Sequence, residues 1–155
     1  DTDRSRGLGD VYKRQTMNKI LLASHGYLAQ GMKSSLEILM GTNDRIECLC
    51  AYVDDDSRDV AALIDAWMET RDPADSWFVV TDIFGGSVNN EFIQRQTDGS
   101  FTLITGMNLP LLVEMVTQLD SLDADKAKAA VEGSRSFIQL CEAVDMLAGA
   151  EEEEF

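Results

Sequence analysis

The chain has 155 residues, of which 28 are acidic and 13 basic, so its formal net charge at pH 7 is −15. Nucleic-acid phosphates repel such a chain, which excludes DNA and RNA as expected partners. Hydrophobic residues make up 45% of it, enough for one packed domain, but no apolar run approaches the ~18–20 residues that a membrane-spanning helix needs.

The chain has three cysteines, Cys48, Cys50 and Cys141, and we find no secretion signal. An odd number of cysteines without such a signal is typical of a protein in a reducing cytoplasm. Cys48 and Cys50 lie in an apolar run, where alternate residues of a strand point to one face. Thiolate zinc sites usually need four ligands at characteristic spacings, and the only histidine lies on another segment. We therefore expect small strand residues here, no metal site, and a cytoplasmic protein.

The sequence divides into three parts. Residues 1–16 lack apolar periodicity and the apolar core of a signal peptide, so we interpret them as a non-native or disordered extension, or else a short native arm. Met17 opens an apolar run, and we place the domain at residues 17–148. Residues 149–155 contain four consecutive glutamates and are expected to form an acidic disordered tail.

Apolar runs alternate along the domain with segments of helical periodicity. The runs predict four strands, at residues 19–24, 46–53, 77–81 and 101–105. Helices are predicted at residues 28–40, 60–68 and 87–96, from Pro110 to about Leu119, and from a cap at Asp123 to about Leu147. Alternating strands and helices favour a three-layer α/β/α sandwich with a mostly parallel central sheet.

Polar or glycine-rich segments follow three of the predicted strands. They are Ser24-His25-Gly26, residues 82–87 (DIFGGS) and Gly106-Met107-Asn108. In sheets of this kind, ligands bind beyond the carboxyl ends of the strands. We therefore expect the three segments to converge on one rim of the sheet.

His25 is the only histidine in the chain. A neutral imidazole can act as a nucleophile toward phosphorus and later release the phosphoryl group. It needs a partner on its other ring nitrogen to fix the tautomer and stabilise the charged adduct, and Asp82 at the end of a neighbouring strand is the candidate. The alternative is a surface or packing histidine without a chemical role.

Gly85, Gly86 and Ser87 suit an anion site, because glycines let backbone N–H groups approach and Ser87 would begin a helix. Ser24 is a candidate second hydroxyl, and Asn108 is a further candidate. For each there is an alternative: a turn at the glycines, a small residue ending a strand at Ser24, and a turn residue before the helix at Asn108.

Asp54-Asp55-Asp56 has two interpretations, a magnesium site or carboxylates that end a strand and cap the next helix, and we favour the second. The chain has no GxxxxGK[ST] loop, so direct use of ATP is not indicated. It also lacks a G-x-S-x-G elbow, which argues against an α/β-hydrolase triad built on Ser24.

Three segments together resemble the mannose-family IIA components of sugar phosphotransferase systems. They are residues 20–26 (ILLASHG), 82–90 (DIFGGSVNN) and 105–114 (TGMNLPLLVE). The resemblance extends from Met17 to about Leu147. One departure is Val88, which stands where most members have a proline after Gly-Gly-Ser.

The resemblance implies a phosphoryl carrier in which His25 accepts the group from the phosphocarrier HPr and passes it to a IIB component. The IIB component would deliver it to sugar at the membrane IIC–IID complex, so the chain would lie in the cytoplasm, at the inner face of the membrane through these partners. It also implies no cofactor and a homodimer with an exchanged antiparallel edge strand. Asp82 would orient His25, and the residues expected around the phosphate are Ser24, Gly26, Gly85, Gly86 and Ser87, with Asn108 as a further candidate.

Three other functions remain open. A dihydroxyacetone kinase phosphocarrier domain shares the expected fold, but would show Ser-His-Ser and a Met-Gly-Ser loop in place of Ser-His-Gly and Gly-Gly-Ser. A regulatory module would use phosphorylated His25 to signal to a binding partner. A small hydrolase would use His25 and Asp82 as a dyad.

Overall fold

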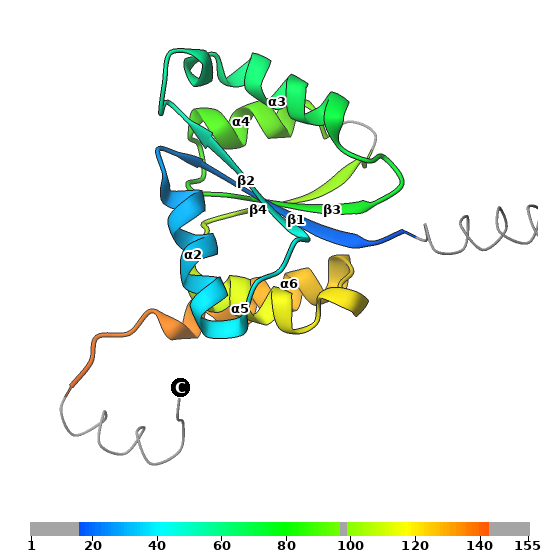
Figure 1. The fold of residues 1–155 in the computed structure, drawn as a ribbon. Coiled ribbons are helices and arrows are strands. Elements are labelled where there is room, and N and C mark those ends of the chain that lie inside the picture. Colours follow the sequence, from blue (N-terminus) through cyan, green and yellow to red (C-terminus); the bar gives the residue numbers. More distant parts are fainter. Residues whose placement is uncertain (1–15, 97–98, 143–155) are drawn as a thin grey trace, which may run out of the picture.

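Four parallel strands form the central sheet of the computed structural model, which describes residues 16–96 and 99–142 (Figure 1). The strands are β1 (Asn18–His25), β2 (Ile46–Ala51), β3 (Ser76–Thr81) and β4 (Phe101–Thr105), in the order β2-β1-β3-β4. The predicted parallel sheet is therefore confirmed. β1 lies between β2 and β3, so its carboxyl end is flanked by the ends of two other strands.

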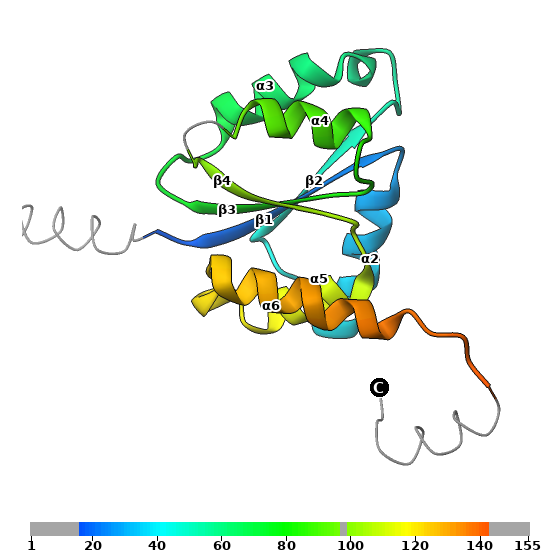
Figure 2. The same cartoon turned by 180° about the vertical axis from the view of Figure 1, so that it is seen from behind.

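Helices cover both faces of the sheet (Figures 1 and 2). On one face lie α3 (Val60–Thr70) and α4 (Ser87–Gln94). On the other lie α2 (Leu28–Met40), α5 (Leu109–Thr117) and α6 (Ala124–Ser134). This arrangement confirms the predicted α/β/α sandwich. Among the described residues, no helix combines the length and the apolar content that crossing a bilayer requires.

Alternation along the strands divides the interior into two cores. Leu21 packs with Ile64 and Phe92 beneath α3 and α4, while its neighbour Leu22 packs with Leu112 on the opposite face. All five side chains are fully buried, as expected when successive strand residues point to opposite faces. The near-continuous apolar strands of the sequence thus reflect a sheet that is buried on both sides.

The two strand cysteines behave as packing residues. Cys48 and Cys50 both lie half-buried against the core beneath α2, α5 and α6, which confirms the prediction that they share one face. Cys48 donates a hydrogen bond from Sγ to the carbonyl of Ala29 at 3.5 Å. Burial raises the pKa of the Cys48 thiol to about 11, so this thiol is neutral at physiological pH.

Side-chain caps fix where α3 and α6 begin. Asp59 accepts a hydrogen bond from the N–H of Ala62 at the start of α3, and Asp123 accepts one from Lys126 at the start of α6. Each satisfies a first-turn donor that has no partner within its helix. The predicted cap at Asp123 is confirmed, whereas α3 is capped by Asp59 and not by the three preceding aspartates.

The predicted long final helix is wrong within the described residues. α6 ends at Ser134, a short 3-10 turn follows at Arg135–Phe137, and Ile138 is extended. The hydroxyls of Ser134 and Ser136 donate to the carbonyls of Val131 and Gly133, a local pairing that competes with helix continuation. Val144 and Leu147, which the prediction also included, lie outside the described residues.

Candidate functional site

The carboxyl ends of β1 and β3 place His25 and Asp82 side by side. His25 is the last residue of β1, and Asp82 directly follows β3. The two strands pair in parallel with Ala23 opposite Thr81, so the chain leaves both strands at the same rim. His25 keeps 39% of its side chain exposed, while the Asp82 side chain is only 9% exposed.

One oxygen of Asp82 holds His25 at two points. Asp82 Oδ2 lies 2.8 Å from both the backbone nitrogen and the ring Nδ1 of His25. Oδ1 of the same carboxylate accepts the N–H of Ile83 at 3.0 Å. Because an ionised carboxylate only accepts hydrogen bonds, Nδ1 carries the ring hydrogen and Nε2 keeps its lone pair. Nε2 is therefore the ring nitrogen whose lone pair faces away from Asp82.

Ser87 stands at the other side of the ring. Its Oγ lies 3.2 Å from His25 Nε2, and Ser87 is the first residue of α4. The hydrogen bond that opens this helix runs from the N–H of Asn90 to the carbonyl of Gly86, at 2.9 Å. The amides of residues 87–89 thus belong to the helix end that attracts anions. The Ser87 hydroxyl thus lies beside Nε2 at the start of this helix, and its role in binding phosphate stays a prediction.

The two glycines before α4 serve different geometric needs. Gly85 has a φ of 81°, a left-handed conformation that glycine adopts without strain. Gly86 has an ordinary φ, but a Cβ there would lie 2.8 Å from Ile83 Cγ2 and 3.0 Å from His25 Cε1. The second glycine is therefore required by the close approach of the imidazole.

The N–H of Gly26 and the hydroxyl of Ser24 both form hydrogen bonds with backbone groups around the turn after β1. The N–H of Gly26 donates to the carbonyl of Ala51 at 2.7 Å, and its φ is 61°. The fully buried hydroxyl of Ser24 accepts the N–H of Ala29 at 2.8 Å and donates to the carbonyl of Gly26 at 3.0 Å. Both groups that were expected to face a phosphate are thus engaged within the turn.

Asn108 likewise has a local role. Its Oδ1 accepts the N–H of Leu111 at 3.0 Å and caps α5, while its Nδ2 donates to the carbonyl of Gly106 at 2.9 Å. The preceding loop is tied to the rim, because the N–H groups of Gly106 and Met107 both donate to the carbonyl of Thr81. The third motif therefore reaches the expected rim but supports it through its backbone.

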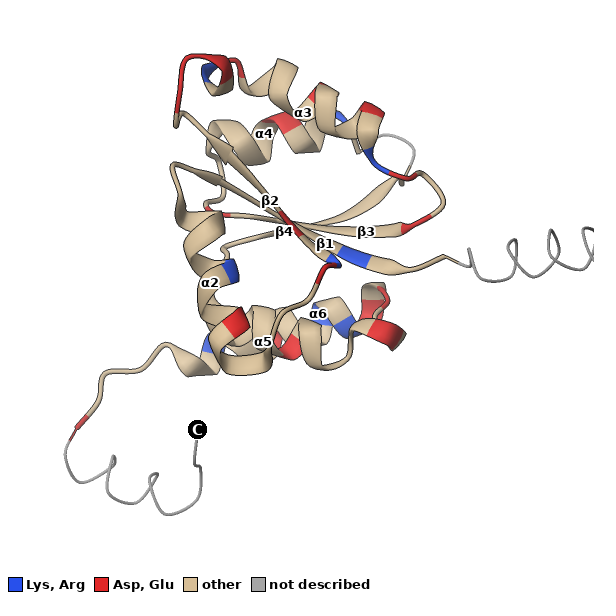
Figure 3. Cartoon of the chain, in the orientation of Figure 1, with Lys and Arg blue, Asp and Glu red and all other residues tan. Residues whose placement is uncertain are grey.

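The three aspartates after β2 form a turn. Asp54 Oδ1 accepts the N–H of Ser57 at 2.8 Å, and hydrogen bonds with Ser57 lower the pKa of the Asp54 carboxyl. Figure 3 shows acidic residues gathered on this segment between β2 and α3. Within the described residues, we find no group of three or more His, Cys, Asp and Glu placed to hold a metal ion.

Tyr52 is the site residue that the sequence prediction missed. The predicted strand 46–53 ends two residues early, at Ala51, and Tyr52 leaves the sheet with a φ of 65°. Its ring stacks on His25 with centroids 5.4 Å apart and planes 14° apart, and its hydroxyl lies 2.8 Å from Ser87 Oγ. The available signal was a tyrosine near the end of a predicted strand whose carboxyl end meets the same rim.

The comparisons with known proteins show which family the chain belongs to. The mannose-type IIA family, described as the phosphotransferase system fructose IIA component, matches residues 19–132. The chain belongs to this family. The expected resemblance is therefore confirmed, and the matched residues of this IIA chain include β1, β3 and the start of α4.

Solved structures of similar proteins support the same assignment. A Klebsiella pneumoniae protein ascribed to a phosphoenolpyruvate-dependent sugar phosphotransferase system permease is 32% identical, with a TM-score of 0.77 over 84% of this IIA chain and 96% of the other. A IIA protein associated with the fucose utilization operon of Streptococcus pneumoniae is 28% identical, with a TM-score of 0.63 over 86% and 98%. The mannose/sorbose-specific IIA subunit of Enterococcus faecalis, 19% identical with a TM-score of 0.63 over 82% and 96%, shares the fold.

Substituting Gly86 with alanine should displace the imidazole while leaving the fold intact. The added Cβ meets the ring of His25 at 3.0 Å and the side chain of Ile83 at 2.8 Å, so one of them must move. Because His25 is the only histidine, its Cε1–H proton gives one resonance, which Gly86→Ala should shift.

Gly31→Ala is the matched control, since a Cβ at this position in α2 meets nothing within 4 Å. It should leave the His25 resonance in place and stabilise the helix by about 0.5–1 kcal/mol. An unshifted His25 resonance in Gly86→Ala would show that the close approach does not constrain the ring.

Proposed function

We propose that this IIA chain is a phosphoryl carrier that accepts the group on His25 Nε2 from phosphorylated HPr and passes it to a IIB component. Through IIB the group would reach sugar at the membrane IIC–IID complex, and the chain would act in the cytoplasm. The observation that carries the proposal is the arrangement of Asp82, His25 and Ser87, with Nδ1 bound to carboxylate and Nε2 facing the start of α4.

The transfer step follows from the tautomer. The lone pair of His25 Nε2 forms a bond to phosphorus as the P–N bond of the donor phosphohistidine breaks, and its electron pair returns to the donor ring. The hydrogen on Nδ1 stays in place, so the phosphorylated His25 ring gains positive charge. Asp82, 2.8 Å from Nδ1, stabilises that charge. Transfer to IIB is the same reaction with the partners exchanged.

The start of α4 would bind the phosphoryl oxygens. The Ser87 hydroxyl lies 3.2 Å from Nε2, where the new phosphoryl group would stand, and Ser87 begins the helix whose first-turn amides would be its further donors. Backbone N–H donors and the positive end of a helix dipole favour anions, the dipole by about 0.3–1 kcal/mol. With Ser24 and Asn108 engaged elsewhere, we assign phosphate binding to Gly85, Gly86 and Ser87, and give Gly26 a supporting role.

Exposed apolar side chains beside the site favour a protein as phosphoryl donor. Ile83 and Phe84, in the loop between Asp82 and Gly85, are 58% and 78% exposed, and Leu28 is 44% exposed. Apolar residues grouped beside a reactive side chain are typical of a surface that docks another protein. This supports protein-bound phosphohistidine, as in HPr and IIB, as the exchange partner.

Incubation with phosphoenolpyruvate, enzyme I and HPr should add one acid-labile phosphoryl group to the native chain, measured by intact mass. His25→Ala should accept none, because no other histidine is present. Asp82→Asn should fold but accept the group about 10–150-fold more slowly, because it loses a charge-assisted hydrogen bond worth about 1.5–3 kcal/mol.

A known IIA protein serves as the control for active components. If that control is phosphorylated and the native chain is not, the carrier function is wrong. If Asp82→Asn matches the native rate, the carboxylate does not orient the ring or stabilise the charged adduct.

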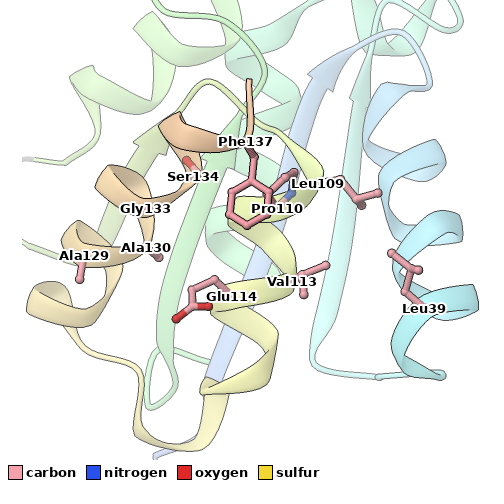
Figure 4. Close-up of a pocket in the computed structure, with 10 residues that line it drawn as sticks. All are labelled: Leu39, Leu109, Pro110, Val113, Glu114, Ala129, Ala130, Gly133, Ser134 and Phe137. Carbon is pink, nitrogen blue, oxygen red and sulfur yellow. The ribbon is translucent and has the colours of Figure 1, made fainter. Parts of the chain in front are cut away.

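A homodimer is the assembly that we propose. β4 is an edge strand of the sheet, and the segment after α6 leaves Ile138 and Leu140 83% and 89% exposed in the single chain. An apolar groove of about 530 Å³ between α2, α5 and α6 opens beside this segment, with Phe137 at its rim (Figure 4). Exchange of the segment as an antiparallel strand on the partner's β4 would bury these side chains and pair the sheet edge.

Light scattering should therefore give twice the 17.1 kDa mass of the chain. Introducing charge with Ile138→Asp and Leu140→Asp should shift the protein toward the monomer, while Ile38→Asp, on the exposed face of α2, should not. A native chain that is monomeric at all concentrations tested would rule out the exchanged strand.

A hydrolase is the second candidate, because Ser87, His25 and Asp82 follow one another in hydrogen-bond order, as in a hydrolytic triad. A hydrolase and a phosphoryl carrier would give different results in two assays. The native chain alone would turn over an activated ester such as p-nitrophenyl acetate, Ser87→Ala would abolish the turnover, and no phosphoryl group would be gained from HPr.

A further inference from the structure

Tyr52 contacts both the ring of His25 and the serine beside Nε2, without belonging to any of the three sequence motifs. Its ring stacks on His25 at 5.4 Å, and its hydroxyl lies 2.8 Å from Ser87 Oγ, which itself lies 3.2 Å from Nε2. The side chain remains 46% exposed. Because the side chain of Tyr52 is so exposed, burial alone does not fix its position, and another restraint is needed.

The turn after β2 supplies that restraint. Tyr52 has a φ of 65°, a left-handed conformation that is rare for an aromatic residue. Its N–H donates to the carbonyl of Ser57 at 3.0 Å, while Ser57 Oγ accepts the N–H groups of Val53 and Asp54 at 2.9 and 3.0 Å. Ser57 is only 5% exposed. The buried serine therefore fixes a turn that directs Tyr52 back toward His25.

The hydrogen bonds along this chain of groups have one consistent direction. The Asp82 carboxylate accepts from Nδ1, so Nε2 of His25 is an acceptor. The hydroxyl of Ser87 must then donate to Nε2, which leaves its oxygen to accept from the hydroxyl of Tyr52. The hydroxyl of Tyr52 thus occupies the Ser87 oxygen while the Ser87 hydrogen points to Nε2.

We propose that Tyr52 is a positioning residue that acts through Ser87, orienting the serine hydroxyl toward Nε2 before transfer and toward the phosphoryl group after it. The inference rests on the proposed carrier function. When Nε2 bonds to phosphorus, the Ser87 hydrogen loses its acceptor, and the nearest new acceptor is a phosphoryl oxygen on the same nitrogen. The hydroxyl of Tyr52 keeps Ser87 directed there, while the stacked ring keeps the imidazole in one orientation.

Single-turnover transfer from phosphorylated HPr tests the kinetic part. Tyr52→Phe keeps the stacked ring and removes the hydroxyl, and should slow phosphorylation about threefold to tenfold, the range for one neutral hydrogen bond. Ser87→Ala should slow it at least as much. Because Tyr52 acts through Ser87, the double variant should be no slower than Ser87→Ala alone.

Nitrogen NMR of the unphosphorylated protein measures the chemical shifts of the two His25 ring nitrogens. These shifts would not change if Tyr52 had only a structural role. Ring-labelled histidine yields the resonances of one imidazole, because His25 is the only histidine. Tyr52→Phe should shift Nε2 downfield, toward a nitrogen without a hydrogen-bond donor, and leave Nδ1 in place. Tyr27→Phe, an exposed tyrosine two residues after His25, is the matched control and should shift neither nitrogen.

A native rate together with an unshifted Nε2 in Tyr52→Phe would overturn the inference, and so would a double variant slower than Ser87→Ala by the full Tyr52→Phe factor. Failure of the carrier function is a separate result. In that case the native chain accepts no phosphoryl group, while the nitrogen spectra still decide whether Tyr52 orients Ser87.

Discussion

A single carboxylate oxygen organises the site. Asp82 Oδ2 accepts hydrogen bonds from the backbone and from Nδ1 of His25, both at 2.8 Å. The backbone contact fixes where β1 ends relative to β3, and the ring contact fixes the tautomer. One interaction therefore joins the fold to the chemistry, because it positions the strand end and leaves Nε2 free to react.

The strand order of the sheet brings the two partners of that interaction together. β1 lies between β2 and β3, and in a parallel sheet all three strands deliver their next residues to the same rim. His25 comes from β1, Asp82 from β3 and Tyr52 from β2, while Ser87 begins the helix that follows β3. The four side chains are thus supplied by three adjacent strands, each buried on both faces.

The part of this site that depends on strand ends and on the placement of glycines was predicted from the sequence. His25, Asp82 and Ser87 were found because each follows an apolar strand directly or begins the next helix. Tyr52 was missed because residues 46–53 look like one continuous strand, and only the structure places the left-handed turn at Tyr52. The roles of Ser24 and Asn108 were not predictable either, since a short polar side chain can satisfy a nearby backbone group as readily as a ligand.

Asp82 occupies Nδ1, and we propose that Nε2 therefore carries the phosphoryl group. The most direct measurement is phosphorus–nitrogen coupling by NMR on the phosphorylated, ring-labelled chain, in which His25 is the only histidine. We expect a phosphoryl group on Nε2 and a hydrogen retained on Nδ1. A phosphoryl group on Nδ1 would contradict it, because Asp82 would then have to leave the ring before transfer.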